Sequence, residues 1–194
     1  MTGGSGATRA RYSERFPATP VCPMPRNIEI KARLGSVAAL EPTVAALATQ
    51  GPVPIAQDDT FFHCAQGRLK LRAFGDGSGE LIFYRRADQA GPKESFYVRS
   101  PTAQPDSLRE ALGLAHGELG RVRKQRTLYL VGRTRVHLDR VHGLGDFLEL
   151  EVVLTDDEPA AVGEQEAQAL LARLGILPGQ LVEGAYLDLL MSPG

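Results

Sequence analysis

Two glutamates separated by one residue form a pattern suited to metal binding. Glu149 and Glu151 lie in FLELEVVL (147–154), a segment in which apolar and charged residues alternate. Successive side chains of a β-strand leave opposite faces, so residues i and i+2 share one face. Two carboxylates side by side offer the hard oxygen ligands that Mg²⁺ and Mn²⁺ prefer. The sequence therefore predicts that this strand contributes to a divalent-metal site.

Basic side chains recur at the same two-residue spacing. In GRLKLRAF (67–74), Arg68, Lys70 and Arg72 share one face. Arginine binds phosphate oxygens through paired hydrogen bonds, and lysine acts on them as a point charge. The segments that alternate cleanly carry nine basic and four acidic residues: Glu29, Lys31, Arg33, Arg68, Lys70, Arg72, Lys124, Arg126, Arg133, Arg135, Asp139, Glu149 and Glu151. Nine minus four leaves a surplus of five positive charges on a chain of formal net charge −1, which predicts local capture of a phosphate-bearing anion.

The composition of the whole chain limits the classes of partner. The 194 residues suit one domain, and 22 Lys and Arg residues balance 23 Asp and Glu residues. This balance argues against broad electrostatic binding to nucleic acid or to an anionic membrane surface. No apolar run approaches the length of a membrane span. Cys22 and Cys64 show neither metal-ligand spacing nor a disulfide framework, so we expect a reducing compartment, the cytoplasm.

Residues 1–24 differ in composition from the rest of the chain. They are rich in Gly, Ser, Thr, Pro and Ala without an apolar period, which predicts a disordered tail before a domain at 25–194. Arg9, Arg11 and Arg15, accompanied by a single acid, suggest an alternative. The segment would then be a transit peptide, and the protein would lie in an organelle matrix. The poor amphipathic character favours the disordered tail.

The segments that position these residues are mostly strands. Alternation predicts strands at 27–34, 67–74, 80–86, 94–100, 119–131, 133–141 and 147–154. Helices are predicted at 36–50, 105–117 and 158–174, with a short helical end near 183–190. Ser36 caps the first helix, and the turn DGSG (76–79) joins two strands as a hairpin. Strands that follow one another without a β-α-β repeat indicate an α+β fold with a mainly antiparallel sheet.

The charged faces of these strands allow two arrangements. In an open antiparallel sheet, one face is commonly wet and carries cross-strand Lys–Glu pairs. In a sheet curled into a barrel, the charged faces meet around a polar lumen, and the apolar faces point outward beneath the helices. Charges interact more strongly in a lumen than on a flat surface. The clustered acids and the surplus of basic residues favour the barrel.

At these residues the sequence resembles the CYTH family, the triphosphate tunnel metalloenzymes, which includes class IV adenylyl cyclases, thiamine triphosphatases and inorganic triphosphatases. The family signature Glu-x-Glu-x-Lys corresponds here to Asn27-Ile28-Glu29-Ile30-Lys31. The resemblance covers about 24–190 and continues through GRLKLR, ELIFYRR, VRKQR, RVHLDRV and FLELEVVL. These segments, with the C-terminal EGAYLDLL, are similar to chains named class IV adenylyl cyclases. The resemblance implies an antiparallel eight-stranded β-barrel, the triphosphate tunnel, with flanking helices.

The resemblance also implies roles for residues at the matching positions. Mg²⁺ or Mn²⁺ would be held by Glu29, Glu149 and Glu151. The substrate would be a small-molecule triphosphate, namely ATP, tripolyphosphate or thiamine triphosphate. It would be bound by Lys31, Arg68, Lys70, Arg72, Arg85, Lys124, Arg126 and Arg135. The catalytic residues would be Lys31, Arg126 and Asp139, and Asp139 would contribute to the metal site or orient a nucleophile.

Asn27 departs from the signature because it replaces the first acid. One missing negative charge lowers the expected metal affinity and argues against a second metal ion. The leading interpretation is a class IV adenylyl cyclase-like enzyme that converts ATP to cyclic AMP and pyrophosphate. A triphosphatase is the alternative, and Asn27 also suits a non-catalytic module that binds polyphosphate or nucleotide. A plain β-barrel interaction module with solvated charges is a further alternative, and a homodimer is one assembly that the sequence leaves open.

Other residue types give weaker signals. His63, His137 and His142 lack tight metal-ligand spacing and are expected in structural or surface roles, although His137 could face the lumen. Neither a GxxxxGK[ST] loop nor a GxSxG turn is present, so phosphate binding would not use a nucleotide loop at a helix start. Packing roles are expected for Phe61, Phe62, Phe83 and Tyr84.

Overall fold

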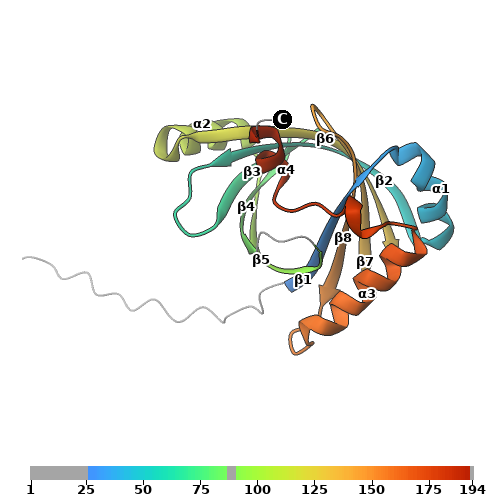
Figure 1. Cartoon of the computed structure of the whole chain (residues 1–194). Helices are drawn as coiled ribbons and strands as arrows, with labels where there is room; N and C mark the ends of the chain where they lie inside the picture. The colour runs from blue at the N-terminus through green and yellow to red at the C-terminus, as the bar shows by residue number, and fades with distance from the viewer. Residues whose placement is uncertain (1–25, 87–90, 193–194) are drawn as a thin grey trace, which may run out of the picture.

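Eight antiparallel strands form a closed barrel, with helices packed outside it and at one opening (Figure 1). This computed structural model describes residues 26–86 and 91–192. The strand order around the barrel is β1-β5-β4-β3-β2-β6-β7-β8. The predicted α+β class and the eight-stranded antiparallel barrel are confirmed. The tail predicted at 1–24 lies outside the described residues.

The strands follow one another in two runs, β2 to β5 and β6 to β8, and helices lie between and after these runs. The strands are β1 (Arg26–Leu34), β2 (Gln50–Phe62), β3 (Arg68–Phe74), β4 (Gly79–Arg86), β5 (Lys93–Thr102), β6 (Glu118–Val131), β7 (Thr134–Val141) and β8 (Gly145–Leu154). The helices are α1 (Val37–Leu47), α2 (Pro105–His116), α3 (Ala160–Arg173) and α4 (Tyr186–Met191), with a 3-10 turn η1 (Pro178–Gln180).

The outward face of the barrel is apolar where helices cover it. Ile28, Ile30 and Ala32 of β1 point away from the lumen and are at most 1% exposed. α3 packs on β1 and β8, while α1 packs on β6, β7 and β8 (Figure 1). Each fully buried aliphatic side chain stabilises the fold by about 1.5 to 3 kcal/mol, so this outer layer holds the barrel closed. The predicted arrangement, with apolar faces outward beneath the helices, is therefore present.

The short helix α4 lies at one barrel opening (Figure 1). Its Tyr186 and Leu187 pack with Phe61, Val122 and Phe147 in a second apolar cluster. Because Phe61 and Val122 face the lumen, α4 closes this end of the barrel with apolar contacts.

The strand β2 was not predicted from alternation. It contains Pro52 and Pro54, which remove backbone donors and are unusual within strands. Its lumen face mixes apolar, neutral polar and acidic residues: Ile55, Gln57, Asp59 and Phe61. Neither face has one chemical character, so the period-two signal is weak. β2 supplies the eighth strand and closes the barrel between β3 and β6.

Candidate functional site

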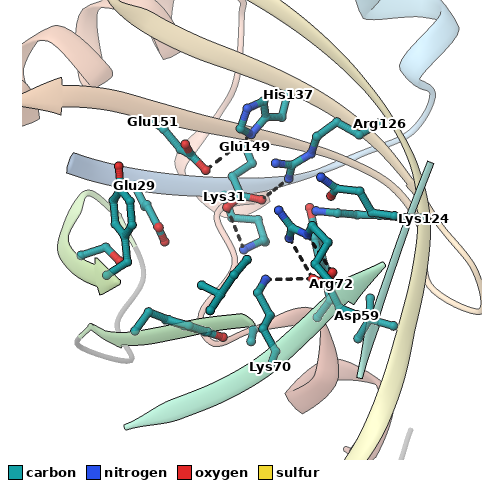
Figure 2. Close-up of a pocket in the computed structure, with 18 of the residues that line it drawn as sticks. Glu29, Lys31, Asp59, Lys70, Arg72, Lys124, Arg126, His137, Glu149 and Glu151 are labelled. Atoms are coloured by element: carbon teal, nitrogen blue, oxygen red, sulfur yellow. Dashed lines mark hydrogen bonds and ion pairs between the residues drawn. The ribbon is translucent and has the colours of Figure 1, made fainter. Parts of the chain in front are cut away.

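One cavity of about 300 Å³ occupies the barrel lumen (Figure 2). This volume is at the lower end of the range for small-molecule sites. Its charged lining residues are Glu29, Lys31, Asp59, Lys70, Arg72, Arg99, Lys124, Arg126, Arg135, Glu149 and Glu151. Its neutral polar lining includes Asn27, Gln57, Ser95, Tyr97 and His137. The strands therefore bring acids and bases that are distant in sequence to one cavity.

Three glutamates from two neighbouring strands meet on one wall. Glu29 of β1 pairs in register with Glu151 of β8, and Glu149 lies two residues away on the same face. The three side chains offer carboxylate oxygens within 4.8 Å of one another. Burial, together with the charges of Glu149 and Glu29, raises the pKa of Glu151. A divalent cation would relieve this repulsion, so the donor set fits Mg²⁺ or Mn²⁺.

Glu149 connects the acidic wall to the basic residues. Its Oε2 accepts a hydrogen bond of 2.8 Å from Arg126, and its Oε1 lies 3.9 Å from the Lys31 Nζ. Burial alone would raise the pKa of Glu149, but Lys31 and Arg126 hold that pKa well below its ordinary value. Glu149 is therefore ionised, and it belongs to the acidic wall while also contacting Lys31 and Arg126.

A first basic cluster surrounds the buried Asp139. Lys124 Nζ and Arg126 Nη2 both donate to its Oδ2, at 2.8 and 2.7 Å, and Arg126 Nε donates to Oδ1 at 2.7 Å. The Tyr186 hydroxyl donates to Oδ2 at 2.9 Å, and the Tyr186 ring lies 4.5 Å from Lys31 Nζ and 4.9 Å from Lys124 Nζ. Burial and the neighbouring Arg126 lower the pKa of Lys124 to about 8.

A second basic cluster surrounds Asp59, a residue that the alternating pattern did not single out. Asp59 accepts hydrogen bonds from Arg72 Nε at 2.7 Å, Arg72 Nη2 at 2.8 Å and Lys70 Nζ at 2.8 Å (Figure 2). Burial would raise the pKa of Asp59, but Arg72 and Lys70 hold it far below its ordinary value. Asp59 was not predicted because the sequence did not reveal β2 as a strand. A strand paired with GRLKLRAF would be expected to supply acids for the two buried bases.

Asp139 does not belong to the cluster of Glu29, Glu149 and Glu151, contrary to one of the roles expected for it. It is fully buried beneath Lys124 and Arg126, and all the hydrogen bonds described above occupy its carboxylate. Burial would raise its pKa, but Arg126 and Lys124 hold it far below its ordinary value. The geometry therefore suits a positioning residue for two cations better than a metal ligand.

Three predicted binding residues have different surroundings. Arg135 lines the cavity and donates to Glu151 Oε2 at 2.9 Å. Arg68 is not among the cavity-lining residues and donates to Asp188 of α4 at 2.8 Å. Arg85 is exposed, with its guanidinium over the rings of Phe83 and Phe96. Its placement in the lumen is corrected, because its neighbour Tyr84 faces the cavity and successive strand residues face opposite ways.

Two other arginines of the charged set also lie outside the cavity. Arg33 is exposed and packs over Phe147 at the end of β1. Arg133 belongs to the turn before β7 and contacts Glu158 and Glu166. In contrast, His137 lines the cavity, with its Nδ1 3.6 Å from Glu151 Oε1. Burial and then Arg126 lower the pKa of His137 well below its ordinary value, so its imidazole is neutral.

Comparison with known proteins assigns the barrel to a family. The model of the CYTH domain matches residues 25–186. The chain belongs to the CYTH family. The chain is similar to the adenylate cyclase CyaB of Aeromonas hydrophila, with 28% identity over 168 residues, which are 82% of this chain and 86% of that protein.

Solved structures share the CYTH barrel at lower identity. A protein of Pyrococcus horikoshii has a TM-score of 0.75 at 22% identity, over 84% of this chain and 98% of that chain. An adenylyl cyclase candidate from Hippeastrum, described as having a dominant triphosphatase activity, has a TM-score of 0.57 at 18% identity, over 84% and 91% of the two chains. These likenesses show the fold. Within residues 26–86 and 91–192, no helix combines the length and the apolar character needed to cross a membrane.

Proposed function

We propose that this CYTH protein binds a triphosphate in the barrel lumen together with Mg²⁺ or Mn²⁺ and converts ATP to cyclic AMP and pyrophosphate. The observation that carries the proposal is the convergence of the glutamate trio with two buried basic clusters around one cavity. Glu29, Glu149 and Glu151 would hold the metal ion, which supplies Lewis-acid polarisation of a phosphoryl oxygen when bound.

The two basic clusters are suited to separate parts of the polyphosphate. Lys31, Lys124 and Arg126 lie beside the metal ligands, and Lys70 and Arg72 form the second cluster. Hydrogen bonds to Asp139 already hold the planar guanidinium of Arg126 in place. Binding of a phosphate to Arg126 therefore costs little side-chain conformational entropy. Such fixed donors stabilise the charge that develops on a departing phosphate.

In the cyclisation, the ribose 3′-oxygen bonds to the α-phosphorus. The bond from that phosphorus to the oxygen bridging to the β-phosphate breaks. The hydroxyl proton ends on the departing pyrophosphate, so no further reactant is required. The similarity to the Aeromonas cyclase supports this reaction.

Hydrolysis is the second candidate reaction. Water would then attack the terminal phosphorus in the same lumen, with the same residues holding metal and phosphate. The observation that favours it is the Hippeastrum relative, which shares the barrel and is described as a dominant triphosphatase.

Product analysis distinguishes these reactions. The purified chain is incubated with ATP, tripolyphosphate and thiamine triphosphate under Mg²⁺ and then Mn²⁺. Cyclic AMP from ATP supports the cyclase, and orthophosphate release without cyclic AMP supports the hydrolase. Binding of all three without turnover would show a non-catalytic module. Absence of both binding and turnover would overturn the proposed function.

A further inference from the structure

Along β1, the side chains that face the lumen change from neutral to acidic to basic. Asn27, Glu29 and Lys31 succeed one another on this face, with about 7 Å between neighbours at strand geometry. In the proposed function, Glu29 holds metal and Lys31 contacts phosphate. Along β1, Asn27 then lies on the far side of Glu29 from Lys31. This order matches that of an organic triphosphate, in which the organic group follows the metal-bound phosphates.

The row of residues at Asn27 is neutral on three adjacent strands. Asn27 pairs in register with Ser95 of β5 on one side and with Val153 of β8 on the other. Ser95 is 1% exposed and lines the cavity. Tyr97 lies two residues along the same face of β5 and also lines the cavity, opposite Tyr84. On β1 and β8, the glutamates are therefore followed by neutral residues, Asn27 and Val153, at the same register position.

The side chain of Asn27 lacks a partner for its carbonyl. It is 2% exposed, and its Oδ1 accepts no hydrogen bond from any described residue. Buried polar atoms without partners are rare because their desolvation is not compensated. A ligand that donates a hydrogen bond at this position would satisfy the amide.

We propose that Asn27, Ser95 and Tyr97 form a subsite for the organic group of the triphosphate, a heteroaromatic ring with an amino group beside a ring nitrogen. The inference rests on the proposed function and names its substrate class. A primary amide offers an acceptor and a donor side by side, which complements such an edge. An aromatic ring such as that of Tyr97 offers a stacking face. Inorganic tripolyphosphate has no group that would satisfy Asn27.

Binding measurements test this subsite. Dissociation constants are measured by calorimetry, with Ca²⁺ replacing Mg²⁺ to suppress turnover, for α,β-methylene analogues of ATP and ITP, thiamine triphosphate and tripolyphosphate. We expect the wild-type protein to prefer the adenine analogue over the inosine analogue by about tenfold, because inosine carries an oxo group in place of the amino group. The tighter of the adenine and thiamine ligands identifies the source of the ring.

Substitutions of the two buried amides, Asn27 and Gln57, allow a matched comparison of ligand affinities. Gln57 is also buried and lines the cavity with an unpaired carbonyl oxygen, but its register partner is Lys124 in the basic region. Asn27→Leu should remove the adenine preference and weaken the adenine analogue about tenfold more than tripolyphosphate. Gln57→Leu should weaken all four ligands by similar factors. If Asn27→Leu does not fold, Asn27→Ser is compared in the same way.

The outcomes separate this inference from the proposed function. Tight tripolyphosphate binding, with equal affinity for the two nucleotide analogues and no tighter binding of thiamine triphosphate, would overturn the subsite and leave the proposed function standing. Equal weakening of tripolyphosphate and the adenine analogue by Asn27→Leu would also overturn the subsite. Failure of every triphosphate to bind would overturn both.

Discussion

Buried carboxylates hold the basic side chains of the lumen in fixed positions. Asp139 fixes Lys124 and Arg126, and Asp59 fixes Lys70 and Arg72. A phosphate that binds these cations meets donors whose orientation is already set, so little reorganisation is needed. The carboxylates also compensate the cost of burying several like charges together.

The pKa of Lys124 predicts a pH dependence of triphosphate binding. This pKa is lowered to about 8, so its ammonium loses its charge as the pH rises through that value. We expect the affinity for tripolyphosphate to fall between pH 7 and about 9.5, as measured by calorimetry. Lys124→Arg should flatten the fall, because a guanidinium stays charged. A steep fall that persists in this variant would assign the titration to another group.

The same shift has an effect on stability with a definite sign. The pKa is about 8 in the folded state and 10.5 ordinarily, so between these values the unfolded chain binds more protons at this lysine. The free energy of unfolding contributed by Lys124 therefore rises with pH in this window.

Glu149 and Glu151 predict that activity depends on a divalent metal ion held by their carboxylates. Glu149→Gln with Glu151→Gln keeps the side-chain shapes but removes two of the three carboxylates that lie within 4.8 Å. We expect metal-dependent turnover to be abolished and Mn²⁺ binding, followed by electron paramagnetic resonance, to weaken at least about a hundredfold. The exposed pair Glu110→Gln with Glu164→Gln is the control and should retain both properties. Full activity of the first double variant would contradict the metal assignment.

At the scale of elements, α4 contributes to the lumen through Tyr186. Its ring lies against Lys31 and Lys124, and its hydroxyl bonds Asp139. Tyr186→Phe keeps the ring and should weaken tripolyphosphate binding less than about threefold, since Asp139 keeps its other donors. Tyr186→Leu removes the ring and should raise KM about fivefold or more with kcat nearly unchanged. Equal KM values in the two variants would show that the ring does not position the lysines.

The close contact between α3 and the barrel predicts that a glycine-to-alanine substitution in this helix lowers the stability of the protein. Alanine normally stabilises a helix relative to glycine by about 1 kcal/mol. At Gly163, however, an added Cβ would lie 2.7 Å from Leu154 and 2.8 Å from Ile28, so Gly163→Ala should lower the free energy of unfolding by about 1 to 2 kcal/mol. Gly113→Ala in α2 meets only the flexible end of Glu118 and should be neutral or stabilising. Denaturant unfolding of both variants checks the difference.

At the scale of the whole molecule, barrel closure decides which charges can meet a ligand. At a hundred times its Kd, tripolyphosphate with Mg²⁺ should stabilise the protein by about 2.7 kcal/mol, a Tm rise of about 5 to 10 °C. Lys70→Met with Arg72→Met should reduce this rise strongly, since both residues line the cavity. Arg85→Met should leave it unchanged because Arg85 is exposed on the outer face. A reduced rise in the Arg85 variant would contradict that placement.

The sequence by itself determined the charged faces and most of the elements. Alternation in β1, β3 and β8 grouped Glu29, Lys31, Lys70, Glu149 and Glu151 on faces that line the lumen, because local geometry alone decides which residues of a strand share a face. The outward apolar faces beneath α1 and α3 follow from the same alternation.

Only the tertiary structure decided which charged side chains contact one another. Asp59 lies on the irregular strand β2, and its role depends on pairing with β3, which local sequence does not specify. Asp139 and Tyr186 meet through the docking of α4, and the direction of Arg85 depends on the register of β4. These contacts join residues far apart in the chain, so their energies depend on strand order and helix packing rather than on local sequence pattern.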